Sequence, residues 1–332
     1  MVTEPGSQEI PISQGGMDVG DIPEVSVIVN CFNEARFLPE TLDSVFAQTF
    51  HDWEIVFWDN ASTDSSSEIA ASYGEKVRCF RSDTLVPLGQ ARQLAYEQTR
   101  GRYIAILDAD DIWLPQKLER QLALFRSEPH LGMVYCDATF FDDKGDRHRL
   151  FQLNKPHRGA AFGHLLARVA ITPSSMFLRR EAVEQLDSVF DARYGRAQDV
   201  DLCLRVAYHH AIDYVDEPLC KWRMVSPAEK PWKTALAPRT VEIRSMMENL
   251  LERYPEIKTK YQTELQSFYG GLDYFFAVTA WENGNPGEAR SYLSPHLISK
   301  KVALVYLSTF FLSFKLFAKL TGAYRAWLAS RS

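Results

Sequence analysis

Four short, mostly apolar segments in the first third of the chain alternate with segments of helical pattern, and no other feature limits the possible folds as much. The four segments are VSVIV (25–29), EIVFW (54–58), VRCF (77–80) and YIAIL (103–107). Their length and their β-branched and aromatic content are typical of strands buried inside a sheet. Strands that alternate with helices of about 10–15 residues form βαβ units. We therefore expect an α/β fold with a parallel sheet and helices on both of its faces.

Polar side chains follow three of these four predicted strands. They are Asn30 and Asn33 after the first strand, Asp59 and Asn60 after the second, and Asp108, Asp110 and Asp111 after the fourth. In sheets of this kind, ligands bind outside the carboxyl ends of the strands. These side chains therefore mark a candidate ligand site at one edge of the sheet.

The acidic cluster after the fourth strand fits a divalent cation. Asp108 and Asp110 are two positions apart, a spacing that lets both side chains reach one bound group, whereas Asp111 is expected to point elsewhere and to cap the next helix. A hard cation takes oxygen ligands, commonly one or two carboxylates together with substrate phosphates. The alternative is that all three are cap and turn residues, positions where Asp is common.

Two further carboxylates have both a structural and a functional interpretation. Asp59 leaves its strand before the Ser- and Thr-rich turn that follows, so turn formation alone accounts for it poorly. Asp199 lies at the start of the helix predicted for AQDVDLCLRVAYHH, where exposed N–H groups and the helix dipole favour a negative charge. Because that is a complete structural explanation for Asp199, a catalytic role needs support from elsewhere.

Composition argues against some classes of function and compartment. The net charge of −6 argues against a broad nucleic-acid surface, so no nucleic-acid partner is expected. The five cysteines include no CxxC pair. Such scattered thiols fit a cytoplasmic protein better than a disulfide framework or a zinc site.

The C-terminal end of the chain differs from the rest in charge. Residues 289–332 contain seven Lys or Arg and no Asp or Glu, and residues 302–314 are uncharged. That run is shorter than the about 20 residues that a membrane-spanning helix needs. Basic flanks around an apolar run fit an amphipathic helix that makes peripheral contact with an anionic membrane surface. A terminal helix docked onto the preceding helices fits about equally well.

Three linked segments resemble the family 2 glycosyltransferases in order and spacing. They are VSVIVNCFNEARFLPETLDSVFAQTFHDWEIVFWDNASTDSS, PLGQARQLAYEQTRGRYIAILDADDIW and AQDVDLCLRVAY, and they extend over about residues 24–225. The resemblance implies a GT-A fold and an inverting transfer of a sugar from a nucleoside-diphosphate sugar, expected to be a UDP-sugar. It also implies a divalent cation, Mg²⁺ or Mn²⁺, and a glycan or lipid-linked acceptor. Such an enzyme is expected in the cytoplasm, at the inner face of the membrane if the tail binds there.

The same resemblance assigns roles to individual residues. The donor is expected to bind Asn33, Glu34, Asp59, Arg92 and Asp108. Within this set, Asp59 is expected to contact the nucleotide base, and Asp108 the ribose or diphosphate. Asp110 is expected to hold the metal ion, and Asp199 to act as the general base. For Arg92 the alternative is a position on a solvated helix face.

Two positions depart from the family's pattern. Gln198 stands where a Glu usually precedes the base, and Val225 stands where a His often adds a metal ligand after Arg223. These changes leave open a second function, a catalytically weak module that binds nucleotide sugars. A nucleotidyltransferase is a third possibility, but NCFNEARF lacks the glycine-rich loop that such enzymes usually carry after the first strand.

The chain is expected to contain four parts. They are a disordered leader (1–22), a GT-A catalytic domain (23–230), a helical hairpin region (231–297) and a basic, apolar C-terminal helix (298–332). The leader contains no basic or aromatic residue, and the hairpin region reads as two helices joined at residues 284–287.

Overall fold

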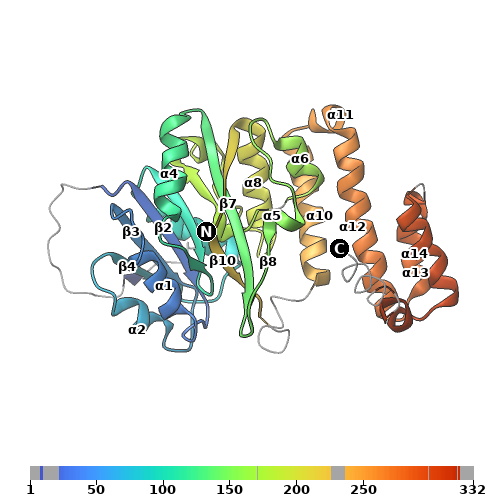
Figure 1. Ribbon diagram of the computed structural model, residues 1–332, viewed down its shortest axis with the longest axis horizontal. Helices are drawn as coiled ribbons and strands as arrows, with labels where there is room; N and C mark the ends of the chain where they lie inside the picture. Colours follow the sequence, from blue (N-terminus) through green and yellow to red (C-terminus); the bar gives the residue numbers. More distant parts are fainter. Residues whose placement is uncertain are drawn as a thin grey trace, which may run out of the picture. The chain divides into compact units, whose positions relative to one another are not determined.

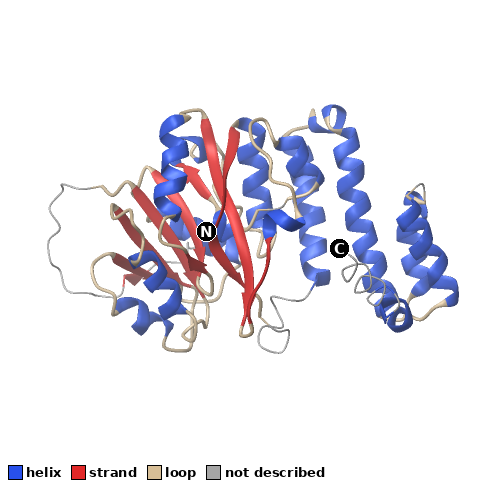
Figure 2. Cartoon of the chain, in the orientation of Figure 1, coloured by secondary structure: helices blue, strands red, loops and turns tan. Residues whose placement is uncertain are grey.

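The computed structural model describes residues 8–9, 22–169, 171–225, 236–297, 299–319 and 321 (Figure 1). The chain divides into two compact units, Met1–Thr234 and Ala235–Ser332. The first unit is built around a sheet, and the second is helical (Figure 2). The division at residue 234 and the boundary after residue 230 that the sequence predicts both lie outside the described residues.

The four predicted strands form one half of the sheet. They are β2 (Val25–Cys31), β3 (Trp53–Asp59), β4 (Val77–Arg81) and β5 (Tyr103–Asp108), which lie parallel in the spatial order β4-β3-β2-β5. Val25 at the start of β2 lies opposite Trp53 on one side and Tyr103 on the other, so these three strands begin at the same level. The predicted βαβ units are confirmed in this half.

Beyond β5 the regular βαβ alternation ends and the sheet is mixed. The strands of this half are β6 (Ile112–Trp113), β7 (Leu131–Asp142), β8 (Gly145–Arg149), β9 (Phe177–Arg179) and β10 (Ala211–Arg223). β9 lies between β5 and β7 and is antiparallel to both, whereas β10 is parallel to β7. The short strands β6 and β8 are antiparallel to β10 and β7, respectively. The long strands all run in one direction. The antiparallel strands are short; β9, which lies between β5 and β7, has only three residues.

Helices cover both faces of the sheet, as expected (Figure 2). α1 (Leu38–Phe46), α2 (Ser66–Ala71) and α4 (Lys117–Ser127) share one apolar core with the strands, and α3 (Leu88–Glu97) packs on β2 and β3 from the other face. In β2, Val27 and Val29 join the first core, whereas Ile28 is buried on the opposite side. The other helices of this unit are α5 (Leu150–Leu153), α6 (Phe162–Ala167), α7 (Arg180–Val183) and α8 (Gln198–His209).

The second unit consists of helices joined by short turns. Those described include α10 (Leu236–Arg253), α11 (Ile257–Lys260), α12 (Gln262–Glu282), α13 (Pro286–Leu293) and α14 (Lys300–Phe311), and residues 314–319 are helical as well. The turn between α12 and α13 contains Gly284, whose φ of +85° is a conformation that glycine adopts without steric cost. Trp281, Leu293 and Val305 come from three different helices and are buried in one core. The C-terminal helix α14 therefore docks on the preceding hairpin, one of the two interpretations of the tail.

The two ends of the chain lie partly outside the described residues. Gln8–Glu9 form β1 and pair with β4 in antiparallel orientation, so two residues of the predicted disordered leader belong to the sheet. Residues 1–7, 10–21 and 322–332 are not described. Among the helices that are described, none is long and apolar enough to cross a membrane.

Candidate active site

The carboxyl ends of the parallel strands bring the predicted polar residues to one edge of the sheet. Cys31 of β2 lies opposite Asp59 of β3, and Asn30 of β2 lies opposite Asp108 of β5. On the far side of β3, Asp59 lies opposite Arg81, the last residue of β4. The strand register alone therefore assembles two carboxylates and one guanidinium at this edge.

Asp59 is completely buried, and both of its carboxylate oxygens accept hydrogen bonds from the protein. The backbone N–H of Ser62 donates to Oδ1 over 2.8 Å, and the hydroxyl of Ser67 and the guanidinium of Arg81 donate to Oδ2. Arg81 was not among the predicted site residues, although a charged residue at the end of a buried strand was a visible signal. The contact between Asp59 and a nucleotide base stays a prediction.

The loop after β2 is fastened to the Ser- and Thr-rich loop after β3. The side-chain oxygen of Asn33 accepts a hydrogen bond from the backbone N–H of Thr63 at 2.7 Å, and the N–H of Glu34 donates to the hydroxyl of Ser66 at 3.1 Å. Asn33 has a φ of +55°, a left-handed conformation in which Asn is enriched among non-glycine residues. These bonds hold Asn33 and Glu34 at the site edge, and their contact with a donor stays a prediction.

Arg92 of α3 bridges two parts of the site that are distant in the sequence. Its guanidinium donates to the carboxylate of Asp108 at the end of β5 and, over 2.9 Å, to the side-chain oxygen of Gln198 at the start of α8. Arg92 is 1% exposed, so the alternative of a solvated helix face is wrong. Its contact with the donor diphosphate stays a prediction, while its bridging of Asp108 and Gln198 is a role that the sequence did not indicate.

A glycine at the start of α3 allows this bridge. A Cβ atom at Gly89 would lie 2.2 Å from the carbonyl oxygen of Asp191 and 2.5 Å from that of Tyr194. The N–H of Gly89 donates to the same Tyr194 carbonyl at 2.8 Å. The first turn of α3 therefore lies directly against the loop that leads into α8, and Arg92, one turn later, reaches Gln198.

Asp110 and Asp111 are both buried, and they differ in what they bind. Asp111 accepts a hydrogen bond from the hydroxyl of Ser174 at 2.5 Å and one from the backbone N–H of Arg223 at 2.9 Å. It therefore joins β10 to the 3₁₀ turn Pro173–Ser175 and does not cap a helix as expected. Arg223 also donates through Nε to the backbone carbonyl of Asp110 at 2.8 Å. A second guanidinium thus lies beside the acidic cluster.

Asp199 occupies the first turn of α8, directly after the buried Gln198. Its side chain is half-buried, whereas the next acidic residue, Asp201, is buried in an ion pair with Arg205. Of the two acids in this turn, Asp199 is therefore the more open to a substrate. Its role as a base stays a prediction.

The residues at this edge fit a divalent cation through one or two carboxylates. Among the described residues, no group of three or more His, Cys, Asp or Glu side chains is arranged to hold a metal ion. Mg²⁺ does not require such a cage, because substrate phosphates and waters complete its coordination. Asp110 supplies the kind of donor that this mode uses, and Asp110 as a metal ligand stays a prediction. Val225, at the position where the family often has a histidine, has an apolar side chain and cannot bind a metal ion.

The fold is of the GT-A type, because the sheet and its helices match those of solved GT-A glycosyltransferases. Two solved structures share the fold. The mannosyltransferase PcManGT from Pyrobaculum calidifontis in complex with GDP-Man and Mn²⁺ superposes with a TM-score of 0.61 over 92% of this chain and 83% of its own, at 19% identity. S. aureus TarS in complex with UDP-GlcNAc superposes with a TM-score of 0.53 over 81% of this chain and 88% of its own, at 18% identity.

Sequence comparison identifies the family within that class. The sequence profile of glycosyl transferase family 2 matches residues 26–187. A glycosyltransferase of Methanocaldococcus jannaschii is 29% identical over 61% of this chain and 72% of its own length. The amylovoran biosynthesis glycosyltransferase AmsB of Erwinia amylovora is 28% identical over 60% of this chain and 70% of its own. Residues 26–187 therefore form a glycosyl transferase family 2 domain, as the sequence motifs indicate.

Proposed function

We propose that this enzyme transfers a sugar from a nucleoside-diphosphate sugar to an acceptor hydroxyl, with inversion at the anomeric carbon and with help from a divalent cation. The observation that supports this most is the bridge made by Arg92. It connects Asp108, expected at the donor, with the first turn of α8, which carries Asp199. A single displacement needs the donor held in place beside a base, and the bridge connects the residues proposed for these two roles.

The residues would divide the reaction between them. Asp199 would take the proton from the acceptor hydroxyl as its oxygen attacks the anomeric carbon, a contribution of about 10²–10⁴-fold in rate. Attack from the face opposite the departing diphosphate inverts the anomeric centre. Asp110 would hold Mg²⁺ or Mn²⁺, which when bound supplies Lewis-acid stabilisation of charge on the leaving diphosphate. The donor is a UDP- or GDP-sugar, the two kinds bound by the similar structures.

The substitution Asp199→Asn tests this assignment. We expect it to lower sugar transfer by at least about 10²-fold and to leave donor affinity within about twofold, because the amide keeps the shape of the side chain and loses only its basicity. Transfer is measured as nucleoside diphosphate released in the presence of an acceptor panel, and donor affinity by calorimetry with Mn²⁺. Asp52→Asn, an exposed change before β3 at the opposite edge of the sheet, is the matched control.

Two results would contradict the proposal. Normal turnover by Asp199→Asn would remove the base assignment. Donor binding by the wild type without any release of nucleoside diphosphate would favour the catalytically weak binding module instead. Gln198 is the feature behind that alternative. Its side-chain oxygen accepts the hydrogen bond from Arg92, so Gln198 has a structural role here and its presence does not by itself require a loss of activity.

We also propose that the enzyme works in the cytoplasm, with α14 in peripheral contact with an anionic membrane surface and a lipid-linked acceptor or glycan within reach. Leu304, Leu307 and Phe311 of α14 are 64%, 56% and 84% exposed, whereas Val305 and Thr309 on the packed side are 3% and 4% exposed. An apolar face with basic surroundings is the pattern of helices that lie in the membrane interface. The excess of Lys and Arg after residue 288 supplies the complementary charge.

Vesicle sedimentation tests the membrane contact. We expect the full-length protein to bind vesicles rich in phosphatidylglycerol more tightly than purely zwitterionic vesicles, and to be released by salt. The triple variant Leu304→Ser, Leu307→Ser, Phe311→Ser should lose binding at least about tenfold, since each buried side chain of this size contributes about 1.5–3 kcal/mol. Leu153→Ser, another exposed leucine, in the first unit, is the control. Equal sedimentation of the triple variant and the wild type would exclude α14 as the contact.

A further inference from the structure

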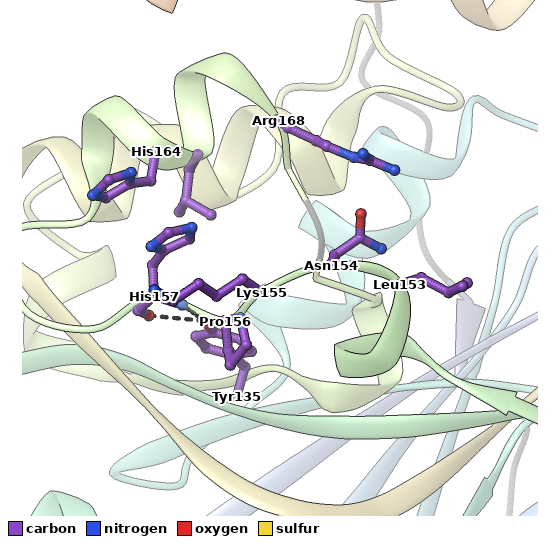
Figure 3. Close-up of a pocket in the computed structure, with 9 residues that line it drawn as sticks. Tyr135, Leu153, Asn154, Lys155, Pro156, His157, His164 and Arg168 are labelled. Carbon is purple, nitrogen blue, oxygen red and sulfur yellow. Dashed lines mark hydrogen bonds between the residues drawn. The ribbon is translucent and has the colours of Figure 1, made fainter. Parts of the chain in front are cut away.

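A polar cavity of about 180 Å³ lies in the first unit, away from the strand ends described above (Figure 3). Its floor is Tyr135 of β7, and its walls come from the segment after α5 and from α6. Pockets for whole drug-sized ligands usually measure about 300–1,000 Å³. This cavity therefore suits a single charged group or one sugar ring.

The lining is basic. Four cationic or titratable basic side chains surround the cavity: Lys155, His157, His164 and Arg168 (Figure 3). None of its lining residues is acidic. Asp213 of the adjoining strand β10 is paired with Arg158 at 3.3 Å. Such a concentration of unbalanced positive charge in a hollow attracts anions.

Two histidines of the wall, His157 and His164, stack on each other. Their ring centroids lie 3.9 Å apart, and the interplanar angle is 6°. The backbone of His157 is held by Tyr135, whose hydroxyl accepts from the His157 N–H at 2.7 Å and donates to the His157 carbonyl at 2.8 Å. Burial, His164 and Lys155 all lower the pKa of His157. The crowding of positive charge is thus unfavourable without a counter-charge, and a bound anion would relieve it.

Asn154 adds a feature that a simple anion does not use. Its side-chain oxygen is buried and has no hydrogen-bond partner among the described residues. A buried acceptor without a partner is uncommon and energetically unfavourable. A ligand hydroxyl next to the anionic group would satisfy it. A sugar that bears a phosphate or a carboxylate has both groups.

The cavity is connected through α6 to the helix that carries the proposed base. The ring of Phe162 in α6 contacts that of Tyr208 near the C-terminal end of α8, with centroids 5.0 Å apart, and the first turn of the same helix carries Asp199. α8 therefore links the wall of the cavity to the proposed base.

We propose that this cavity binds the negatively charged group, phosphate or carboxylate, of an acidic sugar in the acceptor. The binding of an anion is inferred from the cavity alone. That the anion belongs to the acceptor rests on the proposed transferase function. Lys155 and Arg168 supply the charge, and Asn154 receives a neighbouring hydroxyl.

Calorimetric titration of the full-length protein tests the anion site without any turnover. The probes are inorganic phosphate, glucuronate and, as the neutral comparison, glucose. We expect the two anions to bind and glucose not to bind. The double variant Lys155→Gln, Arg168→Gln should bind the better anion at least about tenfold more weakly, since the two charged hydrogen-bond donors are removed. The matched control is Lys76→Gln, Arg102→Gln, which removes the same two kinds of charge from exposed positions before β4 and β5.

Transfer assays then separate the two parts of the proposal. A glucuronide, a sugar phosphate and the corresponding neutral glucoside are compared as acceptors, and the better charged acceptor should lose its advantage in the double variant while donor affinity stays unchanged. Undiminished anion binding by the double variant, or no binding by the wild type, overturns the site even if the enzyme transfers sugars. Anion binding in a protein that transfers nothing would overturn the proposed function and leave only an anion site.

Discussion

Two arginines explain how the chain keeps several carboxylates together at one edge of the sheet. Arg92 pairs with Asp108, and Arg223 binds the backbone of Asp110 while its own N–H donates to Asp111. The sequence suggests that a bound cation is what makes this cluster tolerable, but the protein supplies part of the positive charge itself. A divalent ion would therefore add to a partly balanced site, which makes folding of the site edge less dependent on the metal.

Lys117 is a buried residue that the reaction does not use. Its amine is fully buried, has no hydrogen-bond partner among the described residues, and lies 4.0 Å from the ring centre of Trp113. Burial lowers the pKa of Lys117. A lysine with a lowered folded-state pKa destabilises the fold below its unfolded-state pKa of about 10.4, and the penalty shrinks as pH rises toward that value.

We expect Lys117→Met to raise the free energy of unfolding at pH 7 by about 1–3 kcal/mol, because an apolar group replaces an unsatisfied one of similar size. The difference from the wild type should decrease at pH 9.5. Urea unfolding at both pH values measures it, with the exposed Lys144→Met as control. A variant less stable than the wild type at both pH values would contradict this and point to an ion pair between Lys117 and the nearby Cys136 thiol.

At the scale of elements, one carboxylate joins the amino ends of the parallel strands. Glu54 of β3 is buried and accepts hydrogen bonds from the hydroxyl of Ser26 in β2 at 2.7 Å, from the guanidinium of Arg78 in β4 at 3.0 Å, and from the guanidinium of Arg100 before β5 at 2.7 Å. This cluster holds the edge opposite the site. Burial alone would raise the pKa of Glu54, but the hydrogen bonds from Arg100 and Ser26 outweigh it and lower the pKa.

We expect Glu54→Gln to lower the free energy of unfolding at pH 7 by about 1–3 kcal/mol, since buried charged hydrogen bonds are lost. A carboxylate with a lowered folded-state pKa stabilises above its unfolded value of about 4.3 and loses that contribution as pH falls through the folded value. The gap between variant and wild type should therefore close toward pH 3. Denaturation at several pH values measures the gap, while specific activity of the folded variant should stay unchanged. A gap independent of pH would indicate a packing effect instead.

The same scale shows what could be predicted from the sequence and what could not. The strands β2 to β5 and the helix α8 follow from local pattern, because their apolar residues recur at the spacing of the element. The strand β9, with three residues, is too short for such a pattern. Arg92 and Gln198 are 106 positions apart, and nothing local indicates that one binds the other. Sequence reasoning therefore found the acids at the strand ends and missed Arg81 and Ser174, which hold them.

At the scale of the whole molecule, the chain consists of two units with separate cores. We expect calorimetry to resolve two unfolding transitions. A donor such as UDP-GlcNAc or GDP-mannose with Mn²⁺ should raise only one of them, because a ligand stabilises the part that binds it, by about 2.7 kcal/mol at one hundred times its dissociation constant. Asp110→Asn should reduce the shift caused by Mn²⁺. A single transition that moves as a whole would mean that the two units unfold together.

The positions of the cysteines make this distinction accessible to a chemical label. All five, Cys31, Cys79, Cys136, Cys203 and Cys220, are unpaired and buried, and all belong to the first unit. Burial raises the pKa of Cys31 to about 12 and that of Cys79 to about 11, so in the folded protein these thiols are poor nucleophiles. A maleimide dye would therefore react only when the sheet opens and would not respond to fraying of the helical unit. The native cysteines thus report the unfolding of the first unit, and no engineered probe is needed to distinguish it from unfolding of the second.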